Sequence, residues 1–297
     1  MSYILNGIYL ASFGFTPGRQ ANSNLALSGF LDMPARLGKT FHDWGDEHGV
    51  EPYVTASQIR FGGRDLQLIG WITGTDKQDC YLKSESLVSF VKSFTGLVPL
   101  VTQWGTYQVK INSVPIEYLA DKGLAVTINM REPVVDITGS LPASDNDDYG
   151  IDNISFSALG GFLTEFKGQR RGMPEVKSEQ FTAWQKEGYQ ITKTQAAKIE
   201  FGILVQADTY AAFKTKITSL YALFSKSGTR LMNVKEDAIR EFFVTEGFRL
   251  TTVYKNQLKY LGVVTVTAIQ VNNDFYYLTD NSGNFITDNS LNKIIIR

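Results

Sequence analysis

The sequence predicts a mainly β protein with some α-helix, built from two tandem copies of one domain. Three observations lead to this prediction: a motif recurs at a long offset, each half has one helical pattern after a strand-like run, and each half closes with an alternating strand. The chain has 297 residues, of which 43% are hydrophobic, enough for two cores because a domain usually holds about 100–150 residues. We place the copies at 1–137 and 154–271.

The recurring motif is Met-Pro, six residues, Phe, two residues, Trp, two residues and Glu. It is formed first by Met33, Pro34, Phe41, Trp44 and Glu47, and again by Met173, Pro174, Phe181, Trp184 and Glu187. The offset is 140 residues. Because internal repeats decide the fold assignment, we tested whether neighbouring elements follow in the same order. We expect both tryptophans to occupy equivalent, mostly buried corners of the two cores.

The neighbouring elements do follow in the same order. A strand-like run at Leu66–Ile72 is answered by Ile199–Val205, and each is followed by a helical pattern. In the first helix, which we begin at a Ser84 cap, apolar residues recur at helical spacing and Gly96 is the stop signal. In the second helix, Asp208 or Thr209 is the predicted cap, and Gly228 is the stop signal.

Each half then ends in a strand with period-two alternation. Leu124, Val126, Ile128 and Met130 point one way, as do Val264, Val266 and Ala268 in the second half. The offset between these two strands is again 140 residues. Duplication of one ancestral domain explains the recurrence of the same 140-residue offset better than chance does.

The connections complete the expected organisation. Residues 138–153 are rich in Gly, Pro, Ser, Asp and Asn, which favour turns, so we place a linker there. The first copy also carries an arm of roughly fourteen extra residues around Arg19–Asn24, since Gly7 precedes Met33 by 26 positions and Gly161 precedes Met173 by only 12. We expect this polar arm to be exposed or docked onto a neighbour. The appendage 272–297 holds an octapeptide repeat, which fits a small hairpin or a disordered linker equally well.

Composition excludes several function classes. The 29 basic residues nearly cancel the 30 acidic ones, which disfavours non-specific binding to nucleic acid or to an anionic membrane. The single cysteine, Cys80, allows no intramolecular disulfide and no second thiolate for a metal. No window approaches the roughly 20 apolar residues of a membrane span, and the start lacks a signal-peptide pattern. These features predict a soluble protein assembled in a cytoplasm.

No residue cluster stands out as an active site. His42, Asp43, Asp46, Glu47 and His48 lie close together, but the six-residue histidine spacing is not that of a zinc helix, and the second copy lacks the feature. The acidic run from Asp145 lacks the final carboxylate of a calcium loop. Two histidines in the whole chain leave a Ser or Cys nucleophile few bases. We therefore predict no enzyme, no catalytic residue, no cofactor and no metal.

The first half resembles the distal tail proteins of long-tailed phages. The resemblance spans roughly residues 3–131 and is carried by Asn6-Gly7-Ile8, by the Pro34–Gly38 turn and by Arg64-Asp65-Leu66. The resemblance implies a β-sandwich or split barrel with one flanking helix, whose copies form a ring around the tail channel without catalysis or cofactor. Because the second half looks like another copy of the ring domain, the chain also looks like tail hub proteins, in which three two-domain chains make a pseudo-sixfold ring.

The leading hypothesis is thus a structural component of a phage or prophage tail tip, in the virion, assembled in the cytoplasm of a bacterial host. It would form a ring of three or six chains between the tail tube and the tip or receptor-binding proteins. Its partners would be itself and other tail proteins, with DNA only as passing cargo. The alternative is a tandem carbohydrate-binding module without catalysis, in which aromatic side chains would lie exposed on one face. An enzyme of unfamiliar type would instead show a deep pocket with convergent polar groups.

Overall fold

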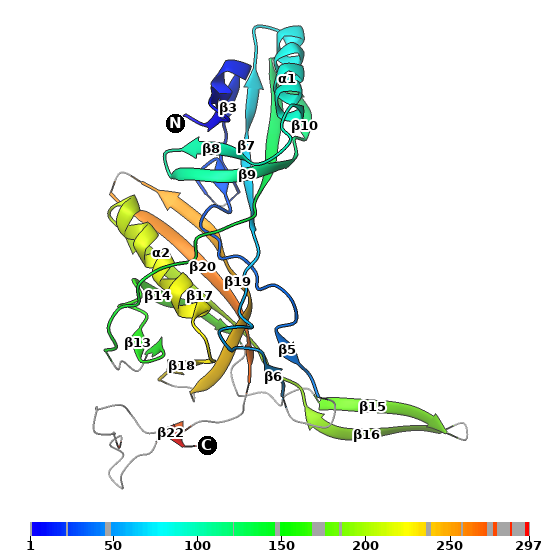
Figure 1. The fold of residues 1–297 in the computed structure, drawn as a ribbon, viewed down its shortest axis with the longest axis vertical. Coiled ribbons are helices and arrows are strands. Elements are labelled where there is room, and N and C mark those ends of the chain that lie inside the picture. Colours follow the sequence, from blue (N-terminus) through cyan, green and yellow to red (C-terminus); the bar gives the residue numbers. More distant parts are fainter. Residues whose placement is uncertain are drawn as a thin grey trace.

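The computed structural model describes residues 2–21, 23–44, 49–120, 122–145, 149–167, 176–183, 186–235, 239–256, 258–271, 276–277, 286 and 295–296. At 119–120, 176–183, 186–193, 276–277 and 295–296 the description covers the backbone. The chain is mainly β, with two main sheets and one α-helix beside each, as the sequence predicts (Figure 1).

The first sheet comes from the first half of the chain. Its strands are β1 (Ile4–Leu5), β2 (Ile8–Tyr9), β3 (Phe15–Pro17), β4 (Leu27–Ser28), β7 (Arg64–Thr73), β8 (Val98–Thr102), β9 (Gly105–Ser113), β10 (Ile116–Ala120) and β11 (Gly123–Glu132). They lie in the order β2-β1-β8-β9-β11-β7-β3, with β10 also beside β11 and β4 also beside β7. A short 3-10 helix, η1 (Leu10–Phe13), links β2 to β3, and α1 (Lys77–Lys92) follows β7.

The second sheet repeats this plan. Its strands are β12 (Tyr149–Ile151), β13 (Ile154–Ser155), β14 (Gly161–Lys167), β17 (Lys198–Ala207), β18 (Arg230–Val234), β19 (Arg240–Lys255) and β20 (Tyr260–Gln270), and α2 (Tyr210–Ser225) follows β17. Their order is β13-β12-β18-β19-β20-β17-β14. Each position in this order matches the first sheet, so among the described strands the two halves share one strand order.

Short hairpins occupy corresponding places between the edge strand and the central strand that precedes the helix. In the first half, β5 (Phe41–His42) pairs with β6 (Glu51–Pro52); in the second, β15 (Val176–Ala183) pairs with β16 (Lys186–Thr194). The predicted repeat partners Phe41 and Phe181 therefore lie in the first strand of corresponding hairpins. Near the C-terminus, β21 (Tyr276–Tyr277) pairs with β22 (Ile295–Ile296), and the octapeptide repeat between them lies outside the described residues apart from Ile286.

The opening turns correct the sequence alignment. Asn6 and Gly7 have φ of 46° and 81°, and Asp152 and Asn153 have φ of 53° and 62°, so both first hairpins have positive φ at both central residues, as a type I′ turn requires. Gly7 thus corresponds to Asn153, not to Gly161, and the predicted surplus of roughly fourteen residues in the first copy is too large. The predicted linker also ends earlier, because residues 149–153 belong to the second sheet.

The N-terminus of α1 differs from the sequence prediction, whereas that of α2 agrees with it. Helix α1 begins at Lys77 after Asp76, whose carboxylate accepts a hydrogen bond from the Asp79 N–H, so the predicted Ser84 cap is wrong. Ser84 lies in mid-helix, where its hydroxyl donates to the Tyr81 carbonyl. The apolar spacing marks only the second half of the helix because the buried positions of its first half are Cys80 and Ser84. Thr209 caps α2, as predicted, by accepting from Ala212 N–H at 3.2 Å.

The two closing strands bury the predicted faces. Alternate residues of β11 and of β20, from Leu124 to Met130 and from Val264 to Ala268, are almost fully buried. However, the pairing of these strands with β7 and β17 shows that the 140-residue offset does not hold throughout the two halves. Leu66 pairs with Met130, and its counterpart Ile199 pairs with Ala268 rather than with Gln270, the residue 140 positions after Met130. The repeat is therefore kept in topology, while small insertions shift its spacing.

Candidate functional site: the interface between the two domains

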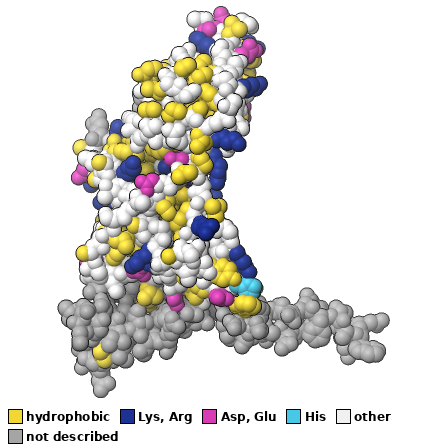
Figure 2. Space-filling model, viewed as in Figure 1, with side chains coloured by type: hydrophobic (Ala, Val, Ile, Leu, Met, Phe, Trp, Pro, Cys, Tyr) yellow, Lys and Arg dark blue, Asp and Glu magenta, His cyan; other side chains and the backbone are white. Residues whose placement is uncertain are grey.

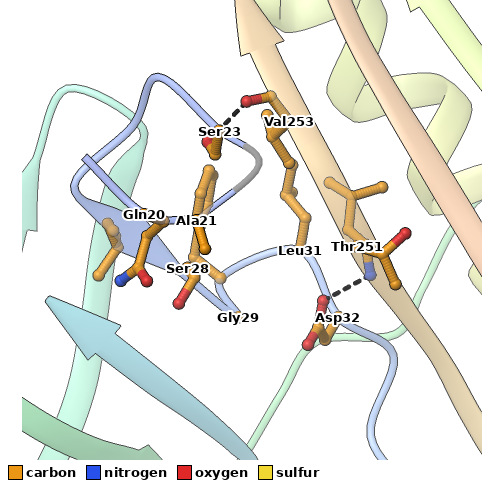
Figure 3. Close-up of a pocket in the computed structure, with 12 residues that line it drawn as sticks. Gln20, Ala21, Ser23, Ser28, Gly29, Leu31, Asp32, Thr251 and Val253 are labelled. Atoms are coloured by element: carbon orange, nitrogen blue, oxygen red, sulfur yellow. Dashed lines mark hydrogen bonds between the residues drawn. The ribbon is translucent and has the colours of Figure 1, made fainter.

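The segment 23–36, here called the first arm, lies along β19 of the second domain (Figure 3). Strand β19 pairs with β18 only as far as Phe242, and the arm covers its edge beyond that point. Met33 N–H donates to the Phe248 carbonyl at 3.0 Å, and Arg36 N–H donates to the Thr245 carbonyl at 3.2 Å. The stretch Arg19–Asn24 was expected to be exposed or docked onto a neighbour. Arg19 is exposed, whereas Ser23 and Asn24 are docked onto the second half of their own chain.

Polar side chains of the arm continue this contact. The Ser23 hydroxyl donates to the Val253 carbonyl at 2.6 Å, and Leu250 N–H donates to the Asp32 carboxylate at 2.8 Å, as the dashed lines in Figure 3 show. Further along, Lys255 N–H donates to Asn24 Oδ1 at 2.8 Å. These bonds satisfy edge groups of β19 that a neighbouring strand would otherwise pair with.

Asp32 lies beside a pocket of about 110 Å³ between the arm and β19. Burial raises the pKa of its carboxyl above the ordinary value of 3.8, while the Leu250 N–H and the charges of Arg64 and Arg249 act in the opposite direction. The interface therefore holds an acidic group whose ionised form is disfavoured by its surroundings.

Arg64, at the start of β7, is the polar centre of the interface. Its Nε donates to Glu132 Oε2 at 2.7 Å, and the two side chains are only 9% and 11% exposed. Its Nη1 lies 3.3 Å from the Tyr221 hydroxyl of α2, and its guanidinium lies 5.7 Å from the Tyr107 ring centroid. Such a buried pair requires its hydrogen bonds, because removing one partner leaves an uncompensated charge.

Tyr221 carries the contact from α2 into the first domain. Its hydroxyl donates to the Leu31 carbonyl at 2.7 Å, and its ring stacks on Phe248 with centroids 5.4 Å apart. Burial raises the pKa of this phenol. The side chain thus fixes the arm, β19 and α2 against one another.

Trp104, in the turn between β8 and β9, fills the remaining part of the interface. Its ring centroid lies 5.0 Å from that of Tyr210 and 6.0 Å from that of Tyr260, at the beginnings of α2 and β20. The Tyr210 hydroxyl donates to the Trp104 carbonyl at 2.9 Å, and burial raises the pKa of Tyr210 to about 12. The Lys255 ammonium stands 5.5 Å from the Trp104 ring centroid.

The two domains meet through different surfaces. The first contributes its arm, the β8–β9 turn and the start of β7, whereas the second contributes α2 and the distal half of β19. In Figure 1, α1 lies on the first domain away from this contact, and β18 lies on the second domain away from it. A two-fold arrangement would bring the same surface of each copy together, so this interface is heterologous.

The predicted repeat anchors have mixed outcomes. Met33 is 3% exposed, Pro34 is buried, and Phe41 packs edge-on against Phe243. Trp44, however, is 45% exposed, so the expected buried corner is wrong at this residue. Its Nε1 donates to Glu51 Oε2 at 2.9 Å across the β5–β6 hairpin, which holds the ring at the surface instead of in the core.

The other anchors remain predictions. Glu47, Met173, Pro174 and Trp184 lie outside the described residues, and Phe181 and Glu187 belong to strands described by their backbone.

The histidine and acidic residues and the cysteine that were considered as chemical sites have structural contacts or are buried where the structure describes them. The His42 ring packs on Trp44, with centroids 3.8 Å apart, and Asp46, Glu47 and His48 lie outside the described residues. Cys80 is buried in the first turn of α1. The Asp145 carboxylate accepts from Ser155 N–H at 2.7 Å. In the described part of the chain, no three His, Cys, Asp or Glu side chains are grouped to hold a metal ion, and no helix is long and apolar enough to span a membrane.

Sequence reasoning missed most interface residues. Arg64 was noted only within a motif, and Tyr221 was passed over because the hydrophobic face of α2 is defined without it. One signal was available: Tyr221 follows Ile217 by four positions, so it lies beside that face with a hydroxyl that a buried site must satisfy. Asp32 and Trp104 lie in connections, where periodicity gives no signal.

Comparison with known proteins shows a likeness to a solved structure. No protein-family model matches the chain, and no curated protein sequence matches it. The structure is similar to that of the Dit protein of phage SPP1, described as a paradigm of the hub adsorption apparatus in phages that infect Gram-positive bacteria. The TM-score is 0.35 at 12% sequence identity, over 91% of this chain and 98% of that chain.

Proposed function

We propose that the chain is a structural, non-catalytic component of a phage or prophage tail tip, which forms a ring around the DNA channel between the tail tube and the tip proteins. The observation that carries this proposal is that two domains of one strand order meet through a heterologous interface. Because the two domains share one fold, each has both contact surfaces. The contact within the chain uses one surface of each domain and leaves the other surface of each domain unused. Repeating the contact from chain to chain makes a ring where the rotation closes.

Charge is compatible with this role. DNA must slide through a channel without sticking, which a dense basic lining would prevent. Figure 2 shows acidic and basic side chains scattered over the face in view, with hydrophobic side chains gathered over the first domain in the upper part. The near-zero net charge also removes one obstacle to self-association.

The carbohydrate-binding alternative requires exposed aromatic side chains on a common face. Trp44 and Trp71 are 45% and 42% exposed, which is the observation in its favour. Trp44 follows β5, however, and Trp71 lies in the distal half of β7, at opposite ends of the first half of the chain in Figure 1. The two exposed tryptophans thus do not form one platform, and the ring-forming role is favoured.

Assembly is the property that tests the proposal. The purified chain, alone and with the co-encoded tail proteins, should give ring-shaped particles in negative-stain images, with masses of three or six chains. A chain that stays monomeric, binds none of these tail proteins and binds a polysaccharide would favour the alternative.

A further inference from the structure

We infer that the β15–β16 hairpin of one copy of this chain docks on the β9–β10 edge of the first domain of a second copy. This inference rests on the proposed ring-forming function and names the contact that would join its chains. It is argued from the internal repeat, because within the chain the connection that contains the β5–β6 hairpin already covers the corresponding edge of the second domain.

The contact within the chain has two parts. The connection between β3 and β7, residues 18–63, covers the edge of β19 from Phe243 to Lys255 through the first arm and the β5–β6 hairpin. Strand β18 stops pairing with β19 at Phe242, so this is the stretch where the sheet would otherwise end in an open edge.

The first domain has the corresponding edge. Strand β8 stops pairing with β9 at Val109, and beyond that point β9 and then β10 run beside β11. Among the described strands, β10 pairs with β11 only. The Thr127 N–H donates to the Pro115 carbonyl, so in the alternating pattern of an antiparallel pair the peptide groups of Ile116 point away from β11.

The second domain has the corresponding covering element. The connection between β14 and β17 contains the β15–β16 hairpin, which projects from the body of the molecule in Figure 1. The two strands have 8 and 9 residues, and at the base of the hairpin Gly49 N–H donates to the Thr194 carbonyl. A two-stranded hairpin by itself is marginally stable in water, so a partner surface is expected.

The side chains around the β10 edge suit a protein contact. Tyr118 is 51% exposed and Tyr81 is 39% exposed, and the Lys77 ammonium lies 5.0 Å and 5.9 Å from their ring centroids. At the same corner of the second domain, Tyr210, Tyr260 and Lys255 surround Trp104 of the first domain. A Lys and two tyrosines thus stand at the start of the helix in both domains, and in the second domain they are covered by the first.

Two full-length variants test the contact. In the first, residues 179–190 are replaced by Asn-Gly, which retains the Ser178–Ile191 pair at the hairpin base and closes it with a two-residue turn. In the second, Tyr118→Asp places a charge beside the β10 edge. The matched control is Tyr9→Asp, because Tyr9 is 56% exposed on β2, at the far edge of the same sheet.

Analytical ultracentrifugation of each variant and of their equimolar mixture gives the decisive result. We expect the unaltered chain and the Tyr9→Asp chain to form rings, and each test variant alone to remain monomeric with an unchanged unfolding midpoint. The mixture should form a 1:1 dimer and stop there, since one variant supplies only the edge and the other only the hairpin. Rings formed by both test variants would overturn this contact and leave the ring function standing. An unaltered chain that is monomeric alone and with its co-encoded tail proteins would overturn both.

Discussion

Asp32 shows at the level of one residue how the domain interface depends on protonation. Because burial raises its pKa above 3.8, the folded chain takes up the proton at a higher pH than the unfolded chain does. Protonation of Asp32 therefore stabilises the folded chain. This stabilisation is complete at pH values below the ordinary pKa of 3.8 and is lost as pH rises through the raised pKa. At neutral pH the ionised Asp32 carboxylate should therefore destabilise the interface.

The Asp32→Asn variant isolates this effect. We expect its free energy of unfolding, relative to that of the unaltered chain, to be highest at neutral pH and to decline as pH falls towards 3.8. Urea unfolding of both chains at a series of pH values measures the difference, in which the contributions of other carboxyls such as Asp79 cancel. A difference that does not change with pH would show that the Asp32 pKa is not raised.

Tyr221 contributes through its hydroxyl. Tyr221→Phe keeps the ring on Phe248 but leaves the Leu31 carbonyl and Arg64 with one bond fewer, so it should cost about 1–2 kcal/mol. Tyr9→Phe, at an exposed position, should change stability by less than about 0.5 kcal/mol. Equal costs in denaturant unfolding would argue against the interface assigned to Tyr221.

Trp104 has the larger predicted effect. It is 4% exposed among Tyr210 and Tyr260, so Trp104→Ala should cost about 3–5 kcal/mol by the usual penalty for a large-to-small change in a packed site. Trp71→Ala, at a ring that is 42% exposed, is the control and should cost much less. Thermal unfolding of both variants makes the comparison, and a smaller loss at Trp104 would contradict the packed interface.

At the scale of elements, the docking of the first arm can be tested by a pair of glycines. Gly247 has φ of 67°, and a Cβ there would lie 2.4 Å from the carbonyl oxygens of Met33 and Pro34 in the arm. Gly7 has φ of 81° but no atom within 4 Å of the same position. Gly7→Ala should therefore cost only the backbone strain, about 1–2 kcal/mol, and Gly247→Ala should cost more because the arm must move. Limited proteolysis should cut the arm faster in the Gly247 variant alone.

The elements also show what the sequence could and could not predict. The strand runs at Leu66–Ile72 and Ile199–Val205, the buried alternation of β11 and β20, and the Thr209 cap follow from periodicity and local chemistry. The start of α1 was missed because the buried positions of its first turns are Cys80 and Ser84, which a search for large apolar residues at helical spacing does not register. The burial predicted for Trp44 was wrong because its ring is held at the surface by Glu51. The β5–β6 hairpin brings these two residues together, and residue spacing does not predict that hairpin.

At the scale of the molecule, the repeat was visible in the sequence, but the way its copies meet was not. Contacts such as Ser23 with Val253 join residues far apart in the chain, and no local pattern reports them. The register of Ile199 with Ala268 likewise shows that equal offsets at two points do not guarantee residue-by-residue equivalence. Strand order was the property that survived divergence, because it is fixed by the connections rather than by individual side chains.

The central claim is that one heterologous contact joins the domains within a chain and recurs between chains. Cryo-electron microscopy of the particle formed by the chain, with its co-encoded tail proteins if these are needed, tests it most directly. We expect a closed ring in which the contact between β15–β16 of one chain and β9–β10 of the next corresponds to the contact between the two domains of each chain. Chains that meet through the same surface on both sides, in a two-fold dimer, would contradict the account.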